Sequence, residues 1–341
     1  MSETATSSRP APSINEPITE CGTGLRPPVP TREAQPGSES SEPKRSVDAL
    51  VGDSLRYRNS AQYRELLEFI RVFPACAPFN GLLVHVQKPG STYVATAGRW
   101  HDRWQRRIKI GAQQLVILQT FGPVLLVVDV SDTEPLANAR PLPLEITDPF
   151  AVLTTAGPAR LEAAFAQTIS NAKRDGVRVH DVAFGAQLAG RIRTASAGVS
   201  QAVEARRRPE VTYVQVPVRF ELEINARQDG FTRYGTLCHE LAHLYCGHLG
   251  TPSKKWWPDR QHLDHRTVDF EAESAAAIAV WKLDPTATMP PYLSQHLARD
   301  KQVPDGMSLD RVLQVAGLIA DMARKRLPLR RRLYAADQRA G

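Results

Sequence analysis

Two histidines and a glutamate in one short segment constrain this chain most strongly. His239, Glu240 and His243 form an H-E-x-x-H pattern within TLCHELAHLYCGHLG, residues 236–250. Residues four positions apart share one face of an α-helix, so both imidazoles would point at one spot and could bind one Zn²⁺. The glutamate between them could act as a general base toward a water molecule that the metal activates. The pattern predicts a helix over about 233–248 that carries a catalytic zinc site; a metal-free, histidine-rich amphipathic helix is the alternative.

A catalytic zinc site needs a third protein ligand. His248 does not match the H-E-x-x-H-x-x-G-x-x-H spacing, and on a continuous helix it would point away from the histidine pair. We therefore expect His248 to support the metal ligands without binding the metal, or to serve structure. Glu271 and Glu273 begin an alanine-rich segment, VDFEAESAAAIAVW, residues 268–281. A carboxylate buried there would need a partner, because burying it alone is costly. One of the two glutamates is predicted to complete the site, unless both simply face water at the start of a helix.

Composition bounds the class of protein. The 341 residues are 42% hydrophobic and 23% charged, which is typical of soluble globular chains, and no apolar run is long enough to span a membrane. Residues 1–45 are rich in Pro, Ser, Thr, Glu and Gly, which predicts a disordered tail. That tail lacks the apolar region of a secretion signal, so we expect a cytoplasmic protein.

Periodicity predicts an α+β fold with two modules. We expect a helix-plus-sheet module over 46–131, a linker over 132–149, a second domain over 150–326 and a basic tail over 327–341. Expected helices cover 60–73, 158–176, 269–283 and 308–326, the last with Ser308 as N-cap, and expected strands cover 80–87, 91–98, 113–119, 123–130, 177–185 and 210–225.

The first module contains a basic segment, RWHDRWQRRIK, at residues 99–109. Its cationic and aromatic side chains are Arg99, Trp100, Arg103, Trp104, Arg106, Arg107 and Lys109. Cations interleaved with tryptophans could contact phosphates and stack on the bases of single-stranded nucleic acid. A surface turn whose tryptophans are anchored in the core, with solvated arginines, explains the same pattern equally well.

The histidine segment followed by VDFEAESAAA resembles the ImmA/IrrE-type metallopeptidases. The resemblance implies a zincin-like fold in which one Zn²⁺ is held by His239, His243 and a glutamate on the next helix. It places that glutamate at Glu271, with Glu273 as the alternative, and makes Glu240 the general base. It therefore implies a zinc metalloendopeptidase that cleaves a protein or peptide substrate.

The first module resembles another family. Residues 79–134, which begin FNGLLVHVQ, are similar to the N-terminal domain of ArdC-type antirestriction proteins, and that resemblance implies binding of single-stranded DNA. Taken together, the two resemblances imply a peptidase linked to DNA, with an antirestriction or repressor-cleaving role and no membrane partner. The alternative is a DNA-binding antirestriction protein in which zinc serves structure alone.

Overall fold

A computed structural model describes residues 57–73, 76–119, 122–137, 139–149, 153–206 and 209–330, and the statements below concern these residues. The predicted tail over 1–45 and the last part of the predicted basic tail lie outside them. The first elements are α2 (Ser60–Val72), α3 (Pro78–Gln87), β1 (Val94–Ala95), α4 (Ala97–Trp104), β2 (Arg106–Ile108), β3 (Gln114–Gln119), β4 (Gly122–Asp129), η2 (Val130–Asp132), β5 (Thr133–Pro135) and α5 (Leu144–Thr147).

The second half adds a sheet and longer helices. They are α6 (Pro158–Arg174), β6 (Val177–Val182), β7 (Gly190–Thr194), β8 (Ser200–Arg206), β9 (Thr212–Pro217), β10 (Phe220–Asn225), α7 (Gly230–Cys246), α8 (His265–Leu283), α9 (Pro291–Arg299) and α10 (Leu309–Arg324). The predicted mixture of helices and sheets is confirmed.

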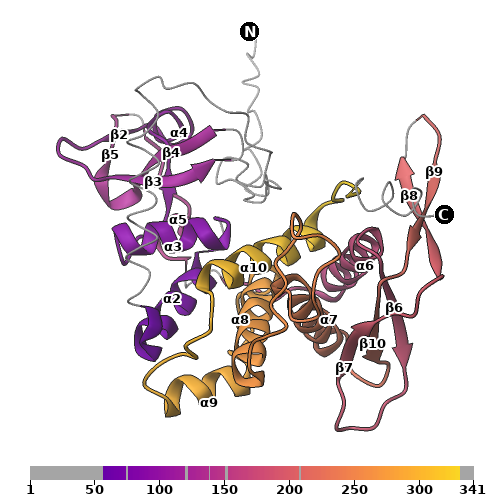
Figure 1. Cartoon of the computed structure of the whole chain (residues 1–341). Coiled ribbons are helices and arrows are strands. Elements are labelled where there is room, and N and C mark those ends of the chain that lie inside the picture. The colour runs from indigo at the N-terminus through magenta and orange to yellow at the C-terminus, as the bar shows by residue number, and fades with distance from the viewer. Residues whose placement is uncertain are drawn as a thin grey trace, which may run out of the picture.

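Helices α7, α8 and α10 form the centre of the molecule, between the first module and the sheet of the second half (Figure 1). Small buried residues such as Ala272, Ala275 and Ala279 line α8, so its neighbours can approach its axis closely. One hydrophobic cluster runs from Leu66 of α2 to Ile319 of α10. The two predicted domains therefore share a core.

The sheet β6-β10-β7 flanks the helices, with β10 parallel to β6 and antiparallel to β7. Leu222 and Ile224 of β10 are fully buried, while Glu221 and Glu223 alternate with them on the other face. Ion pairs join these two glutamates to arginines of both neighbouring strands, Arg178, Arg191 and Arg193. A solvated, charge-paired outer face thus leaves the inner face to pack on the helices.

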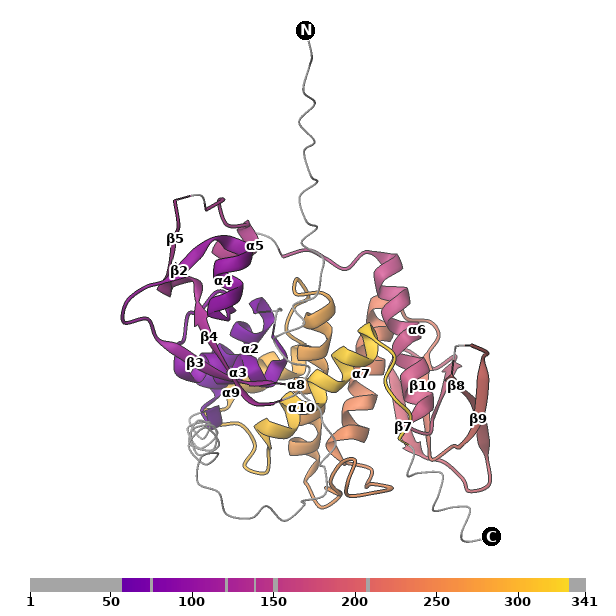
Figure 2. The same ribbon diagram turned by 90° about the horizontal axis from the view of Figure 1, so that it is seen from above.

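Three further sheets among the described residues complete the fold. The view from above shows them on either side of the central helices (Figure 2). Strands β8 and β9 pair only with each other, as an antiparallel hairpin beside the β6-β10-β7 sheet. In the first module, β1-β4-β3 forms an antiparallel sheet, and β5 pairs with β2. Because β5 lies within 132–149, part of the predicted linker is integral to the first module.

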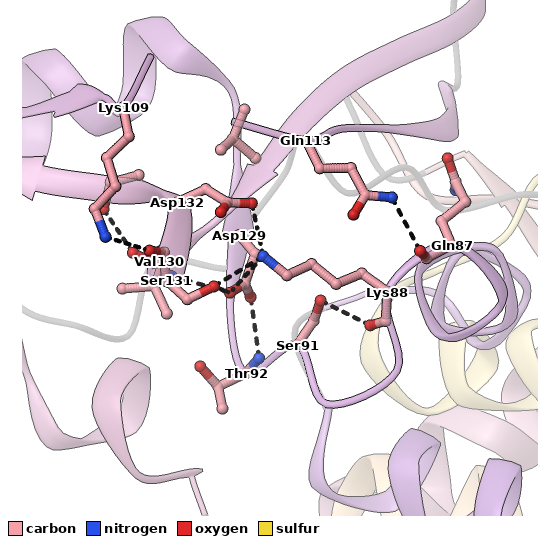
Figure 3. Close-up of polar contacts among 12 residues, drawn as sticks. Gln87, Lys88, Ser91, Thr92, Lys109, Gln113, Asp129, Val130, Ser131 and Asp132 are labelled. Carbon is pink, nitrogen blue, oxygen red and sulfur yellow. Dashed lines mark hydrogen bonds and ion pairs between the residues drawn. The ribbon is translucent and has the colours of Figure 1, made fainter. Parts of the chain in front are cut away.

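A partly exposed salt-bridge network fixes the end of α3 to the turn after β4 (Figure 3). Nζ of Lys88 lies 2.6 Å from Oδ2 of Asp132 and 2.8 Å from Oγ of Ser131. The buried carboxylate of Asp129 accepts hydrogen bonds from the backbone N–H groups of Thr92 and Ser131. These contacts satisfy polar groups that the small sheet would otherwise bury without partners.

Two strand predictions in the first module are wrong. Residues 80–87 belong to α3, which begins at Pro78 and buries Leu82, Leu83 and Val84; a short apolar run does not distinguish a buried helix from a strand. Residues 91–98 contain only the two-residue β1, because Thr96 caps α4 by accepting a hydrogen bond from the backbone N–H of Arg99. The predicted strand 210–225 is divided into β9 and β10. The elements that were not predicted include α4, β2, β5, α5, β7, β8 and α9.

Among the described residues, no helix combines the length and the apolar character that a membrane span requires.

Candidate metal centre

Helix α7 presents the histidine pattern in its second half. Asp229 caps its N-terminus by accepting hydrogen bonds from the backbone N–H groups of Phe231 and Thr232. The helix ends at Cys246, after which Gly247 adopts a left-handed conformation with φ of 88°. The predicted helix is confirmed, with a start a few residues earlier than expected.

The structure brings the two histidines together at their Nε2 atoms. Nε2 of His239 lies 3.0 Å from Nε2 of His243, and the rings meet edge to face. Two nitrogen ligands of a tetrahedral zinc ion, each roughly 2.0–2.1 Å from the metal, stand roughly 3.3 Å apart. The spacing of the pair therefore fits two ligands of one ion.

The pKa values of the two histidines shift in opposite directions. Burial, together with the neighbouring His239 and His248, lowers the pKa of His243 to about 2, so this ring is neutral and offers a lone pair. Burial alone would lower the pKa of His239, but the hydrogen bond from its ring to Glu273 and the charges of Glu273 and Glu240 raise it. A metal ion that binds His239 must therefore displace a proton that these carboxylates favour.

The two candidate glutamates of α8 have different surroundings. Oε2 of Glu273 lies 2.7 Å from Nδ1 of His239, and the Glu273 side chain is partly exposed. The Glu271 side chain is fully buried, and its carboxylate accepts hydrogen bonds from both terminal nitrogens of Arg260 and from the backbone N–H of Ser308, at 2.5–2.6 Å. Residues two apart on a helix face different directions, so α8 presents Glu273 to the pair and Glu271 to Arg260.

His248 returns to the histidine pair, contrary to the expectation that it points away. The helix is not continuous, and after Gly247 the backbone N–H of His248 donates to the carbonyl of His243. Its ring is buried, with Nδ1 3.2 Å from Nδ1 of His243 and Nε2 3.0 Å from Oε2 of Glu271. Both expected roles of His248, supporting the metal ligands and serving structure, are compatible with these contacts.

Cys246, His248 and Glu271 place donor atoms within 4.8 Å of one another. Two features oppose a cation at this point. Burial raises the pKa of the Cys246 thiol well above its ordinary value, so it stays protonated and ligates poorly. Arg260 already neutralises Glu271 with two hydrogen bonds, and its guanidinium would repel a metal ion. Within the described ranges, the contacts of the His239–His243 pair are to His248 and Glu273, and none is to an arginine or lysine.

Glu240 is buried beside the pair and held by strand β7. Burial raises the pKa of its carboxyl, and a backbone hydrogen bond from Ile192 of β7 opposes that shift. Strand and helix approach closely at Gly190, where an added Cβ would lie 2.5 Å from Cγ2 of Thr236 and 2.8 Å from the carbonyl oxygen of Glu223. This glycine lets β7 reach Glu240.

The basic segment of the first module divides into buried and exposed residues. Trp100 is fully buried, packs against Tyr93 and Trp104, and donates from Nε1 to the carbonyl of Val128 at 2.8 Å. The prediction of a base-stacking role for Trp100 is therefore corrected, because its ring is an anchor of the small core. Trp104 is partly buried, with the guanidinium of Arg103 4.6 Å above its ring.

The remaining cations of the segment differ in what they contact. Arg106 binds Thr133 through Nε and a terminal nitrogen, which ties β2 to β5. The exposed Arg107 pairs with Glu134 at 2.7 Å, and Nζ of Lys109 donates to the carbonyl of Ser131 (Figure 3). Arg99 is partly buried, whereas Arg103 is exposed. The solvent-facing cations are Arg103, Arg107 and Lys109.

Three contacts that support the site were not predicted. They are made by Ile192 with Glu240, by Arg260 with Glu271, and by the backbone N–H of Ser308 with Glu271. A buried carboxylate needs a partner, and this requirement could have indicated that a cation contacts Glu271. The sequence does not say which cation supplies that partner. In the structure, the backbone N–H of Arg260 donates a hydrogen bond to the carbonyl of Gly247 at 2.9 Å, and this contact holds Arg260 near the end of α7.

Comparisons with known proteins add little to this geometry. No protein-family model matches the chain, and no curated protein matches it. A crystal structure of the antirestriction protein ArdC from plasmid R388, in a metal-free state, is similar to this chain with 15% sequence identity and a TM-score of 0.31, covering 72% of this chain and 82% of that one. A similarity with a TM-score this low does not bear on the role of the site residues.

Proposed function

We propose that this chain is a zinc-dependent peptidase in which His239, His243 and Glu273 hold the metal and Glu240 is the general base. The observation that carries the proposal is the approach of two Nε2 atoms to 3.0 Å, with a buried glutamate beside them on the same helix. Glu273 replaces Glu271 as the proposed third ligand, because Glu271 is already held by Arg260, whereas Glu273 is partly exposed and lies against the His239 ring. To bind the metal, the Glu273 carboxylate would have to move from Nδ1 of His239 toward the Nε2 atoms of the pair. Carboxylate and imidazole together form a donor set that zinc accepts at catalytic sites.

Each side chain has a defined part in the proposed reaction. Zinc held there would supply Lewis acidity toward a water molecule and a peptide carbonyl. Glu240 would take a proton from the attacking water and deliver it to the leaving amine. The hydrogen bond from Ile192 holds the Glu240 carboxylate in one orientation, and the buried surroundings exclude competing bulk water.

The test compares three variants of the full chain. Purified wild type should contain one zinc ion and cleave members of a peptide library, with cleavage followed by mass spectrometry. Glu240→Gln should keep the zinc and lose cleavage, whereas His239→Ala should lose both. Glu162→Gln, on exposed α6 surface, is the matched control and should behave as wild type.

The alternative function, a DNA-binding antirestriction protein with structural zinc, predicts a different pattern. The exposed Arg103, Arg107 and Lys109 favour contact with phosphates, while the burial of Trp100 removes one of the two predicted stacking surfaces. We propose that any DNA contact of the first module is mainly electrostatic. If the zinc is only structural, Glu240→Gln leaves every activity intact and wild type cleaves nothing.

A further inference from the structure

We infer that His248, held by Glu271, is a positioning residue that fixes the His243 ring with its proton on Nδ1 and its Nε2 lone pair toward His239. The inference rests on the proposed function, since it assigns to these residues the task of strengthening metal binding. It concerns buried polar groups that the proposed reaction does not use. It also explains why Glu271, although close to the histidine helix, is directed away from the histidine pair.

The argument begins at Glu271, whose carboxylate is the fixed acceptor of the network. Its oxygens accept from both terminal nitrogens of Arg260 and from the backbone N–H of Ser308, at the N-terminus of α10. These donors come from the loop before α8 and from α10, while the carboxylate itself sits on α8. With three elements holding it and no solvent exposure, this carboxylate has one orientation.

That orientation determines where the proton of His248 resides. Nε2 of His248 lies 3.0 Å from Oε2 of Glu271, and a carboxylate can only accept, so Nε2 of His248 must carry the proton. Arg260 already supplies the counter-charge of Glu271, so a second cation at His248 would be buried without a partner. A neutral imidazole has one N–H, and Nδ1 of His248 is therefore left as an acceptor. The carboxylate thus selects one tautomer of the ring.

The same donor and acceptor argument applies to His243. Its Nδ1 lies 3.2 Å from the accepting Nδ1 of His248, so Nδ1 of His243 must be the donor. Its Nε2 is then unprotonated, and it is this atom that lies 3.0 Å from Nε2 of His239. A lone pair is thereby aimed at the proposed metal position before any metal binds, which lowers the cost of organising the site.

The end of α7 makes this arrangement geometrically available. His248 lies five residues after His243, a spacing at which side chains on an uninterrupted helix diverge. The left-handed Gly247 ends the helix and turns the chain back, and an added Cβ at that position would lie 2.0 Å from the carbonyl oxygen of Pro258. The turn that returns His248 to His243 is therefore also the turn that brings the loop of Arg260 against the helix.

The first experiment reads the tautomer directly. In metal-free, ¹⁵N-histidine-labelled full chain, long-range ¹H–¹⁵N spectra should show His243 with a protonated Nδ1 and a bare Nε2, its signal identified by its loss in His243→Gln. A His243 ring protonated at Nε2 would overturn the inference without the use of any His248 variant.

The second experiment measures zinc affinity by competition with a chelator. His248→Leu removes the acceptor and should weaken zinc binding by about 10–100-fold, the usual effect of losing a partner that orients a metal ligand. His248→Asn places an amide oxygen near the position of Nδ1 and should restore most of that affinity. His262→Asn, an exposed histidine outside the network, is the matched control.

The outcomes separate this inference from the proposed function. Unchanged zinc affinity in His248→Leu, or equal losses in the Leu and Asn variants, contradicts the positioning role while leaving the zinc site in place. A wild-type chain that binds no zinc contradicts the proposed function and the predicted effect of His248 on zinc affinity. The tautomer measurement uses metal-free protein, so it still decides how His248 orients His243.

Discussion

Oε2 of Glu273 lies 2.7 Å from Nδ1 of His239, and this contact joins α8 to the histidine face of α7. Two residues earlier on the same helix, Glu271 forms a buried ion pair with Arg260 instead. The two glutamates look alike in sequence, yet one carboxylate lies against the His239 ring and the other holds the surrounding structure. Their substitution by glutamine should therefore have opposite consequences.

Glu273→Gln should weaken zinc binding by roughly 100-fold or more, because an amide is a much poorer zinc ligand than a carboxylate. The metal-free chain should keep nearly the stability of wild type, since Glu273 is partly exposed and has one histidine as its contact. Chelator competition and denaturant unfolding measure the two effects. Wild-type zinc affinity in this variant would exclude Glu273 as a ligand.

Glu271→Gln should destabilise the fold by about 3 kcal/mol, because the buried guanidinium of Arg260 would lose its counter-charge. Urea unfolding of the metal-free protein checks this, so that altered metal binding does not contribute. The exposed Glu162→Gln is the matched control. Unchanged metal-free stability would contradict the structural role of Glu271, and loss of zinc binding in a stably folded variant would instead indicate that Glu271 is a ligand.

Gly190→Ala should destabilise the protein by about 1–3 kcal/mol, because the new methyl group would overlap Thr236 and the backbone of Glu223. Separation of β7 from α7 would also loosen Glu240, so peptide cleavage should fall more than zinc binding. Gly235→Ala on α7 is the control: a Cβ there meets nothing within 4 Å. That variant should be stabilised slightly, as usual for glycine to alanine within a helix.

Replacing Arg103, Arg107 and Lys109 by glutamine in one triple variant should lower any affinity for single-stranded DNA and reduce its dependence on salt. Each lost phosphate contact reduces the slope of log K against log salt by about 0.7. Arg160, Lys254 and Lys301, replaced together, give a control of equal net charge. A slope that is the same in both triple variants would exclude this segment as the DNA contact.

Lys282 should make stability depend on pH. Its Nζ donates to the carbonyl oxygens of Phe73 and Cys76 at 3.0 and 2.9 Å, and burial lowers its pKa to about 7, against an ordinary value near 10.5. Between these values the unfolded chain binds more protons than the folded one, so the contribution of Lys282 to stability increases as pH rises above 7.

The measurement is the difference in unfolding free energy between wild type and Lys282→Met at pH 7 and pH 8.5. Taking the difference removes the titration of groups that both proteins share. Wild type should gain about 1–2 kcal/mol relative to the variant over this interval. A difference that does not change with pH would show that the folded Lys282 keeps its ordinary pKa.

Local sequence patterns predicted the elements that depend on nearest neighbours along the chain. The helix of His239 and His243 and the N-cap Ser308 were predicted correctly, because a helix face and a cap are set by residues within one turn. Residues 80–87 were predicted as a strand and form a helix, since a short apolar run is compatible with either until its neighbours are known.

The sequence by itself determined that two imidazoles and a glutamate share one helix, because spacing along a helix is a local property. Tertiary structure alone decided which glutamate meets that face, since the packing of α8 on α7 turns Glu273 toward His239 and Glu271 toward Arg260. It also decided the place of His248, through a left-handed glycine that reverses the chain. Contacts between distant segments depend on how whole elements pack, and spacing along the chain does not contain that information.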